Sequence, residues 1–125
     1  MIEDAPVIIC GFPSPAEDYR ENVLDFNAYL ETNRPSVFAL RAKGLSMTGA
    51  GIFPEDIIIV DKAKEAVHGS LVVACIGGYF TLKRLYLTPR IVLHAENPDY
   101  DDITLSNMEE LIIFGTVTAI VRKMR

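Results

Sequence analysis

The chain has 125 residues, half of them hydrophobic, which is the usual size and composition for one domain with a core of its own. Its 12 basic and 17 acidic residues give a formal net charge of −5, and an acidic surface repels phosphate, so direct binding to nucleic acid is not expected. The two cysteines, Cys10 and Cys75, stand in no CxxC or Cys/His cluster and no glycine-rich nucleotide motif is present, so neither a metal nor another cofactor is predicted.

The first ten residues form a short apolar arm that ends at the dipeptide Cys10-Gly11. The chain begins with an acidic stretch where a signal peptide carries basic residues. After the arm, the segment 11–15 contains two prolines, which exclude a helix or a central strand. We therefore predict a flexible arm over residues 1–10, a domain over residues 11–125, and a soluble protein of the cytoplasm.

One helix and a series of short strands are predicted after the arm. The helix covers residues 21–31, because Val23, Phe26 and Leu30 fall on one face and Pro35 closes the segment. Gly77-Gly78 is predicted to form a two-residue hairpin turn. The predicted strands are 37–41, 56–61, 70–76, 79–85, 90–95 and 111–122.

Five or six strands at this spacing, with a single early helix, predict a compact, mostly antiparallel β domain. The longest nearly apolar stretch, residues 71–80, has about half the length that spans a bilayer and is interrupted by glycines, so no membrane span is predicted.

Ser46 is a candidate nucleophile. It follows Gly44 and precedes the glycine-rich segment 48–51, so it is expected on an exposed bend after a strand. Backbone N–H groups on such a bend can converge on an oxyanion. Serines in glycine-rich loops are also common without a catalytic role, and a serine hydroxyl becomes a nucleophile only beside a base.

The two histidines are possible bases. His68 precedes Gly69 in a predicted turn, and His94 lies at a strand end with no nearby carboxylate suited to orient it. Without a catalytic role, His68 would be a turn residue and His94 a partly buried strand residue. A Ser-His-Asp triad assembles from distant parts of a sequence, so this alternative stays open.

Lys83 is a further possible base. On the strand predicted at 79–85, Thr81 and Lys83 share a face. A lysine in an apolar sheet loses hydration, which favours the neutral amine. To act as a base near neutral pH, its pKa has to fall from about 10.4 to roughly 7–8. The plainer alternative is a lysine that extends from an edge strand into solvent.

A set of short stretches along the chain carries a resemblance to a known family. In chain order they are Cys10-Gly11-Phe12-Pro13-Ser14-Pro15-Ala16, Asp18-Tyr19, Gly44-x-Ser46-Met47, Ile59-Val60-Asp61, His68-Gly69, Phe80-Thr81-x-Lys83-x-Leu85, Ile103-Thr104-x-Ser106, Phe114-Gly115-x-Val117 and Met124-Arg125. In their order and spacing they resemble the UmuD branch of the LexA/UmuD self-cleaving peptidase family. The resemblance covers the chain from residue 10 to residue 125 and implies a LexA/signal-peptidase-like β fold.

The resemblance implies a role for each residue of the site. Ser46 would attack the carbonyl carbon of the Cys10–Gly11 peptide bond, and an uncharged Lys83 would take the serine proton. The backbone N–H groups of Leu45 and Ser46 would hold the oxyanion, and Thr81 would be a partner of the lysine amine.

The resemblance also implies a place in the SOS response to DNA damage. Slow self-cleavage would be accelerated by RecA filaments on single-stranded DNA. The trimmed form, expected as a homodimer, would be the accessory subunit of a UmuC-type, Y-family polymerase in error-prone translesion synthesis. Two alternatives remain: a polymerase accessory or binding module without an enzymatic role of its own, and a repressor-type domain lacking its DNA-binding half. The second is disfavoured because no helix-turn-helix segment precedes residue 10.

Overall fold

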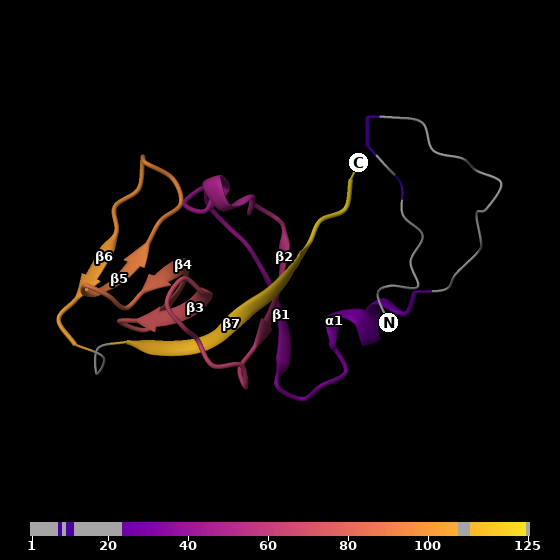
Figure 1. The fold of residues 1–125 in the computed structure, drawn as a ribbon, viewed down its shortest axis with the longest axis horizontal. Helices are drawn as coiled ribbons and strands as arrows, with labels where there is room; N and C mark the ends of the chain where they lie inside the picture. Colours follow the sequence, from indigo (N-terminus) through magenta and orange to yellow (C-terminus); the bar gives the residue numbers. More distant parts are fainter. Residues whose placement is uncertain (1–7, 9, 12–23, 108–110, 125) are drawn as a thin grey trace.

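The computed structural model describes residues 8, 10–11, 24–107 and 111–124, and in them the chain forms one short helix and a series of strands (Figure 1). In chain order the elements are α1 (Phe26–Leu30), β1 (Val37–Arg41), the 3-10 turn η2 (Thr48–Ala50), β2 (Ile57–Asp61), β3 (Leu71–Ile76), β4 (Tyr79–Tyr86), β5 (Ile91–His94), β6 (Ile103–Leu105) and β7 (Ile112–Val121). None of the helical turns in these ranges is long and apolar enough to cross a bilayer.

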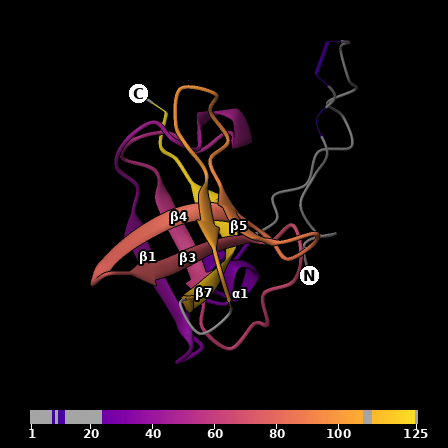
Figure 2. The same cartoon turned by 90° about the vertical axis from the view of Figure 1, so that its left-hand side faces the viewer.

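The strands form one seven-stranded sheet in the order β1-β2-β7-β3-β4-β5-β6, and every neighbouring pair is antiparallel. Figure 1 shows β7 passing between the β1–β2 end and the β3–β6 end of the sheet. In Figure 2, β3 and β4 run across the direction of β1, as expected when strand twist accumulates across a sheet. The predicted fold class, a mostly β antiparallel domain with one short helix, is confirmed.

The sheet buries apolar side chains on both faces because successive strand residues point to opposite sides. On β3, Val73 packs in a cluster with Met47 and Ile52, whereas its neighbour Val72 packs in a second cluster with Leu85 and Leu93. The first cluster holds the β1–β2 loop against the sheet through Met47, the residue that follows Ser46.

The helix is shorter than the predicted range of 21–31. It begins at Phe26 because Asp25 caps it, its carboxylate accepting the backbone N–H groups of Asn27 and Ala28. Residues 21–23 of the predicted helix lie outside the described residues. Phe26 is exposed and no residue of α1 is buried, so the apolar spacing does not mark a helix that faces the core.

The strand predictions differ from the structure mainly in number. β1 has the predicted bounds, and the other five predicted strands differ by one residue at one or both ends. β6 was not predicted, so the sheet has seven strands instead of five or six. Its three residues are too few to show an alternating pattern, and only pairing with β5 defines it as a strand.

Candidate active site

Ser46 lies in the loop between β1 and β2. Gly44, two residues earlier, has a φ of 80°, a left-handed conformation that glycine adopts without strain. Leu45 is exposed and Met47 is buried, so Ser46 stands between a solvent-facing residue and one anchored in the core. The loop therefore presents the serine at the surface while its C-terminal side is fixed to the sheet.

Lys83 reaches Ser46 from β4. Its Nζ lies 3.1 Å from Oγ of Ser46 and 2.7 Å from Oγ1 of Thr81, and it donates to the main-chain oxygen of Leu82 at 3.1 Å. The structure thus brings Ser46, Lys83 and Thr81 together, with the serine on a loop and the other two side chains on one strand.

The Lys83 side chain is buried, with only 8% of the residue exposed. Burial lowers the pKa of Lys83 from its ordinary value of 10.5, because removal from water disfavours the ammonium form. Across the described ranges, no aspartate or glutamate forms an ion pair with it. In the described part of the chain, therefore, no carboxylate partner raises the pKa of Lys83 back toward its ordinary value.

The oxygen neighbours of Nζ fit a neutral amine. Such an amine has two N–H donors and one lone pair, while a carbonyl oxygen only accepts and a hydroxyl either donates or accepts. The Lys83 amine is placed to donate to all three oxygens, and in its neutral form two N–H groups directed at Leu82 and Thr81 would leave the lone pair for the hydroxyl of Ser46. This is the geometry in which an amine takes a proton from a serine.

The burial of Lys83 predicts a gain in stability when the amine is removed. We expect Lys83→Met to raise Tm by roughly 2–5 °C at neutral pH, because an apolar side chain of similar length is not penalised for losing water. Because the lowered pKa means that the folded protein holds this proton less tightly than the unfolded chain, wild-type stability rises with pH between that pKa and 10.5. The variant should lack this rise.

Thermal unfolding followed by circular dichroism across neutral and alkaline pH measures both effects. Lys64→Met, at an exposed position, is the matched control and should leave Tm nearly unchanged. A lower Tm for Lys83→Met at every pH would mean that the hydrogen bonds of the amine stabilise the fold by more than its burial costs.

A cavity of about 450 Å³ opens beside Ser46 and Lys83. Its walls are mainly apolar, and they include Leu40, Ala42, Ile52, Val73, Phe80 and Leu82. Tyr100 contributes from the loop between β5 and β6. Arg41 and Lys43 also line the cavity, so its walls combine apolar surface with two basic side chains.

The backbone N–H groups of Leu45 and Ser46 donate no hydrogen bond to any group in the described part of the chain. They belong to a bend whose serine lines the cavity. Adjacent N–H groups on a bend are the kind of donors from which an oxyanion hole is built, although Leu45 itself does not line the cavity.

His94 has a carboxylate partner, Asp102, contrary to the prediction that none lies nearby. Its Nδ1 lies 2.8 Å from Oδ1 of Asp102, and the hydrogen bond lowers the pKa of that carboxyl group. The prediction was wrong because the loop after β5 folds back and returns Asp102 to the strand end. Within the described residues, Ser46 is hydrogen-bonded by Lys83 and by neither His94 nor His68.

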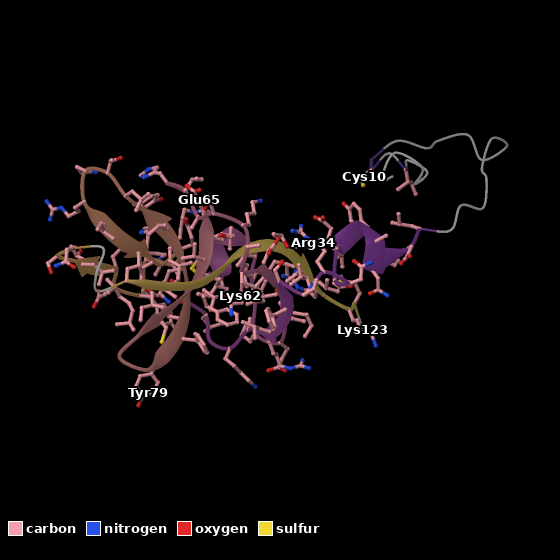
Figure 3. All side chains as sticks on the ribbon, turned by 90° about the horizontal axis from the view of Figure 1, so that it is seen from below. Cys10, Arg34, Lys62, Glu65, Tyr79 and Lys123 are labelled. Carbon is pink, nitrogen blue, oxygen red and sulfur yellow. The ribbon has the colours of Figure 1, made fainter. Side chains whose placement is uncertain are left out.

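Cys10 and Gly11 are both exposed, and neither lines the cavity beside Ser46. In Figure 3, Cys10 lies at the end of the molecule away from Tyr79 and the β3–β4 hairpin. The structure therefore does not bring the predicted scissile bond to the serine. Apart from Ile8 and Cys10, the predicted arm lies outside the described residues.

The structure adds two neighbours of the serine loop that the sequence did not single out. Glu96 and Asn97 hydrogen-bond to the segment 45–49 from the loop after β5. The dipeptide Asn97-Pro98 predicts a turn, but nothing in it indicates which segment the turn contacts. In the ranges that the structure describes, no three histidine, cysteine, aspartate or glutamate side chains are grouped so as to hold a metal ion.

Residues 6–118 match the Peptidase S24-like family, so the match covers most of the chain. The chain therefore belongs to this family, which includes self-cleaving serine peptidases.

Three relatives confirm the prediction of a UmuD-type member. The chain is 47% identical to protein SamA of Salmonella typhimurium over 115 residues, which cover 92% of this chain and 80% of SamA. It is 42% identical to protein ImpA of Salmonella typhimurium over 117 residues, covering 92% and 79% of the two chains. It is 39% identical to protein MucA of Escherichia coli over 112 residues, covering 89% and 77%.

Proposed function

We propose that the chain is a self-cleaving serine peptidase of the SOS response, in which Ser46 is the nucleophile, Lys83 is the general base and Cys10–Gly11 is the bond that is cut. The observation that carries this proposal is the 3.1 Å contact between Nζ of Lys83 and Oγ of Ser46. The amine is buried, its pKa is lowered, and no carboxylate among the described residues pairs with it. Membership of the Peptidase S24-like family supports the same chemistry.

The first half of the proposed reaction forms an acyl-enzyme. Oγ of Ser46 attacks the carbonyl carbon of Cys10 while its proton moves to Nζ of Lys83. The N–H groups of Leu45 and Ser46 hold the negative oxygen of the tetrahedral intermediate. The intermediate collapses, the peptide bond breaks, and the lysine ammonium returns its proton to the departing amine of Gly11.

The second half releases the arm. Lys83, neutral again, takes a proton from a water molecule that attacks the ester between Ser46 and Cys10. Collapse of this intermediate returns the proton to Oγ and frees residues 1–10 with a new carboxyl group. The products are the ten-residue arm and a domain of residues 11–125 with a free amine at Gly11.

The exposed position of Cys10 makes the reaction conditional on a conformational change. The scissile bond has to enter the cavity beside Ser46, so the rate is limited by the population of the conformer in which it does so. A RecA filament on single-stranded DNA would act by binding that conformer preferentially, without adding a catalytic group of its own. Self-cleavage without RecA is then slow but uses the same residues.

The trimmed chain is proposed to act as a homodimer and as the accessory subunit of a UmuC-type, Y-family polymerase in error-prone translesion synthesis. The UmuD-type relatives support this assignment. The partners are then proteins of the cytoplasm, and the net charge of −5 is consistent with contact through proteins and not directly through DNA.

Mass spectrometry of the purified chain incubated with RecA filaments tests the proposal. We expect two products, residues 1–10 and a chain beginning at Gly11, formed faster than without RecA. RecA without single-stranded DNA is the control and should give the slow rate. Fragments that begin elsewhere, or an intact chain under all conditions, would contradict the proposed cleavage.

A mutagenesis assay distinguishes a self-cleaving peptidase from a binding module without enzymatic activity. The assay uses cells that lack their own copy of the gene for this protein. If cleavage is the switch, Ser46→Ala should abolish damage-induced mutagenesis, and a chain starting at Gly11 that carries the same substitution should restore it. Full activity of the uncut Ser46→Ala chain would favour the binding-module alternative. Binding of DNA by the isolated chain at moderate salt would favour the repressor-type alternative.

A further inference from the structure

We propose that Asn97 is a positioning residue for Ser46, holding the serine loop at the distance from Lys83 that proton transfer requires. This inference rests on the proposed function and extends it beyond the serine, the lysine and their immediate neighbours. It comes from the contacts between the loop that follows β5 and the loop that carries the nucleophile.

The Asn97 side chain ties together two residues that flank Ser46. Its Nδ2 donates to the main-chain oxygen of Leu45 at 2.8 Å and lies 3.3 Å from Oγ1 of Thr48. The serine stands between these two attachment points. Rotation of the Leu45–Ser46 peptide, which also carries the N–H of Ser46, would break the shorter of the two hydrogen bonds.

The amide of Asn97 is itself oriented. Its Oδ1 accepts the backbone N–H of Asp99 at 2.9 Å, and its main-chain oxygen accepts that of Tyr100 at 3.0 Å. Because Oδ1 is engaged inside its own turn, Nδ2 is left to face the serine loop. Pro98 follows directly and restricts the backbone of Asn97.

Glu96 adds a main-chain attachment beside the one that Asn97 provides. Its carbonyl oxygen accepts the N–H of Gly49 at 2.7 Å, and its N–H lies 3.5 Å from the sulfur of Met47. A Cβ on Gly49 would overlap the carbonyl oxygen of Glu96, so the two loops approach as closely as a glycine permits. The segment 45–49 is therefore held along its length by two consecutive residues.

The same strand supplies the base and fixes this support. Arg84 lies next to Lys83 on β4. Its Nε donates to the carboxylate of Glu96 at 2.5 Å, and a terminal guanidinium nitrogen donates to the main-chain oxygen of Gly69 at 2.6 Å. β4 thus carries the Lys83 amine itself. Through Arg84 and Glu96, it also fixes the segment 45–49, which carries the Ser46 hydroxyl. A displacement of about 1 Å in such a pair lowers the rate by up to about a hundredfold, which is the effect expected from loss of the Asn97 contact.

Self-cleavage of the full chain, measured without RecA as a function of pH, tests the role of Asn97. We expect Asn97→Ala to lower the plateau rate at alkaline pH by about 10- to 100-fold and to leave the midpoint of the pH profile unchanged, because Lys83 is not its partner. Asn97→Asp keeps the acceptor for Asp99 but loses the donor toward Leu45, so it should also be slow. Asn33→Ala and Asn33→Asp, at an exposed position, are the matched controls and should cleave at the wild-type rate.

Hydrogen exchange at the N–H of Gly49 gives a second readout that does not depend on cleavage. Exchange should be at least about tenfold faster in Asn97→Ala than in wild type, with Tm still well above the assay temperature. Plateau rates within twofold of wild type for a folded variant, or unchanged exchange at Gly49, would overturn the inference. If wild type itself yields no fragment at any pH, the proposed function fails, and the exchange result alone decides whether Asn97 holds the loop.

Discussion

The Ser46→Ala protein is expected to release no fragment that begins at Gly11, at any pH and with or without RecA filaments. Removal of Oγ takes away the hydroxyl that is proposed to form the ester intermediate. Lys83→Ala keeps the hydroxyl but removes the base that lies 3.1 Å from it, so we expect its rate to fall by about 10²- to 10⁴-fold. Mass spectrometry over a time course measures both rates.

Controls for these variants need to separate loss of chemistry from loss of fold. Lys64→Ala changes the residue type of the base at an exposed position outside the cavity and should cleave at the wild-type rate. Circular dichroism should show folded domains for all three variants. Cleavage of Ser46→Ala at the wild-type position and rate would refute Ser46 as the nucleophile, whatever the role of Lys83.

The local geometry of the lysine was predictable from the sequence because it depends on strand periodicity alone. In a strand, residues two apart share a face, and Thr81 lies 2.7 Å from the amine of Lys83 as that rule requires. The contact between Lys83 and Ser46 joins two distant segments, and neither residue type nor local pattern specifies such a pair. Only the resemblance to a family linked the two positions before the fold was known.

The fold was predictable where alternation and turn residues extend over several positions. The hairpin at Gly77-Gly78 and the strands around it follow from such patterns, and both glycines have positive φ. The pattern of a helix over 21–31 was misleading because Asp25 offers a side-chain cap that starts the helix late. β6 escaped prediction because its three residues become a strand only by pairing with β5.

The supporting contacts of the site were the least predictable. The Arg84–Glu96 ion pair, the Asn97 hydrogen bonds and the His94–Asp102 contact all depend on how the loop after β5 returns toward the sheet. Loops of this kind are set by long-range contacts and carry little periodicity of their own. The reactive residues are therefore easier to predict from a sequence than the residues that hold them in place.

The rate of self-cleavage without RecA is expected to rise about tenfold for each pH unit and then to reach a plateau. The active species carries a neutral Lys83, and the neutral fraction grows tenfold per unit below the pKa of the amine. Because burial lowers that pKa, the plateau should begin below 10.5, the ordinary value for lysine. The measurement is the first-order rate of appearance of the Gly11 fragment across neutral and alkaline pH.

A rise with pH alone does not identify the base, because hydroxide attack on a peptide also accelerates with pH. Hydroxide attack has no plateau, and Lys83→Arg distinguishes the two, since a guanidinium stays protonated throughout this range. The arginine variant should show only the slow background, while Lys62→Arg, at an exposed position, should follow the wild-type curve. A wild-type rate that is flat or falls as pH rises would exclude a lysine base, because protonated Lys83 has no lone pair with which to accept the proton of Ser46.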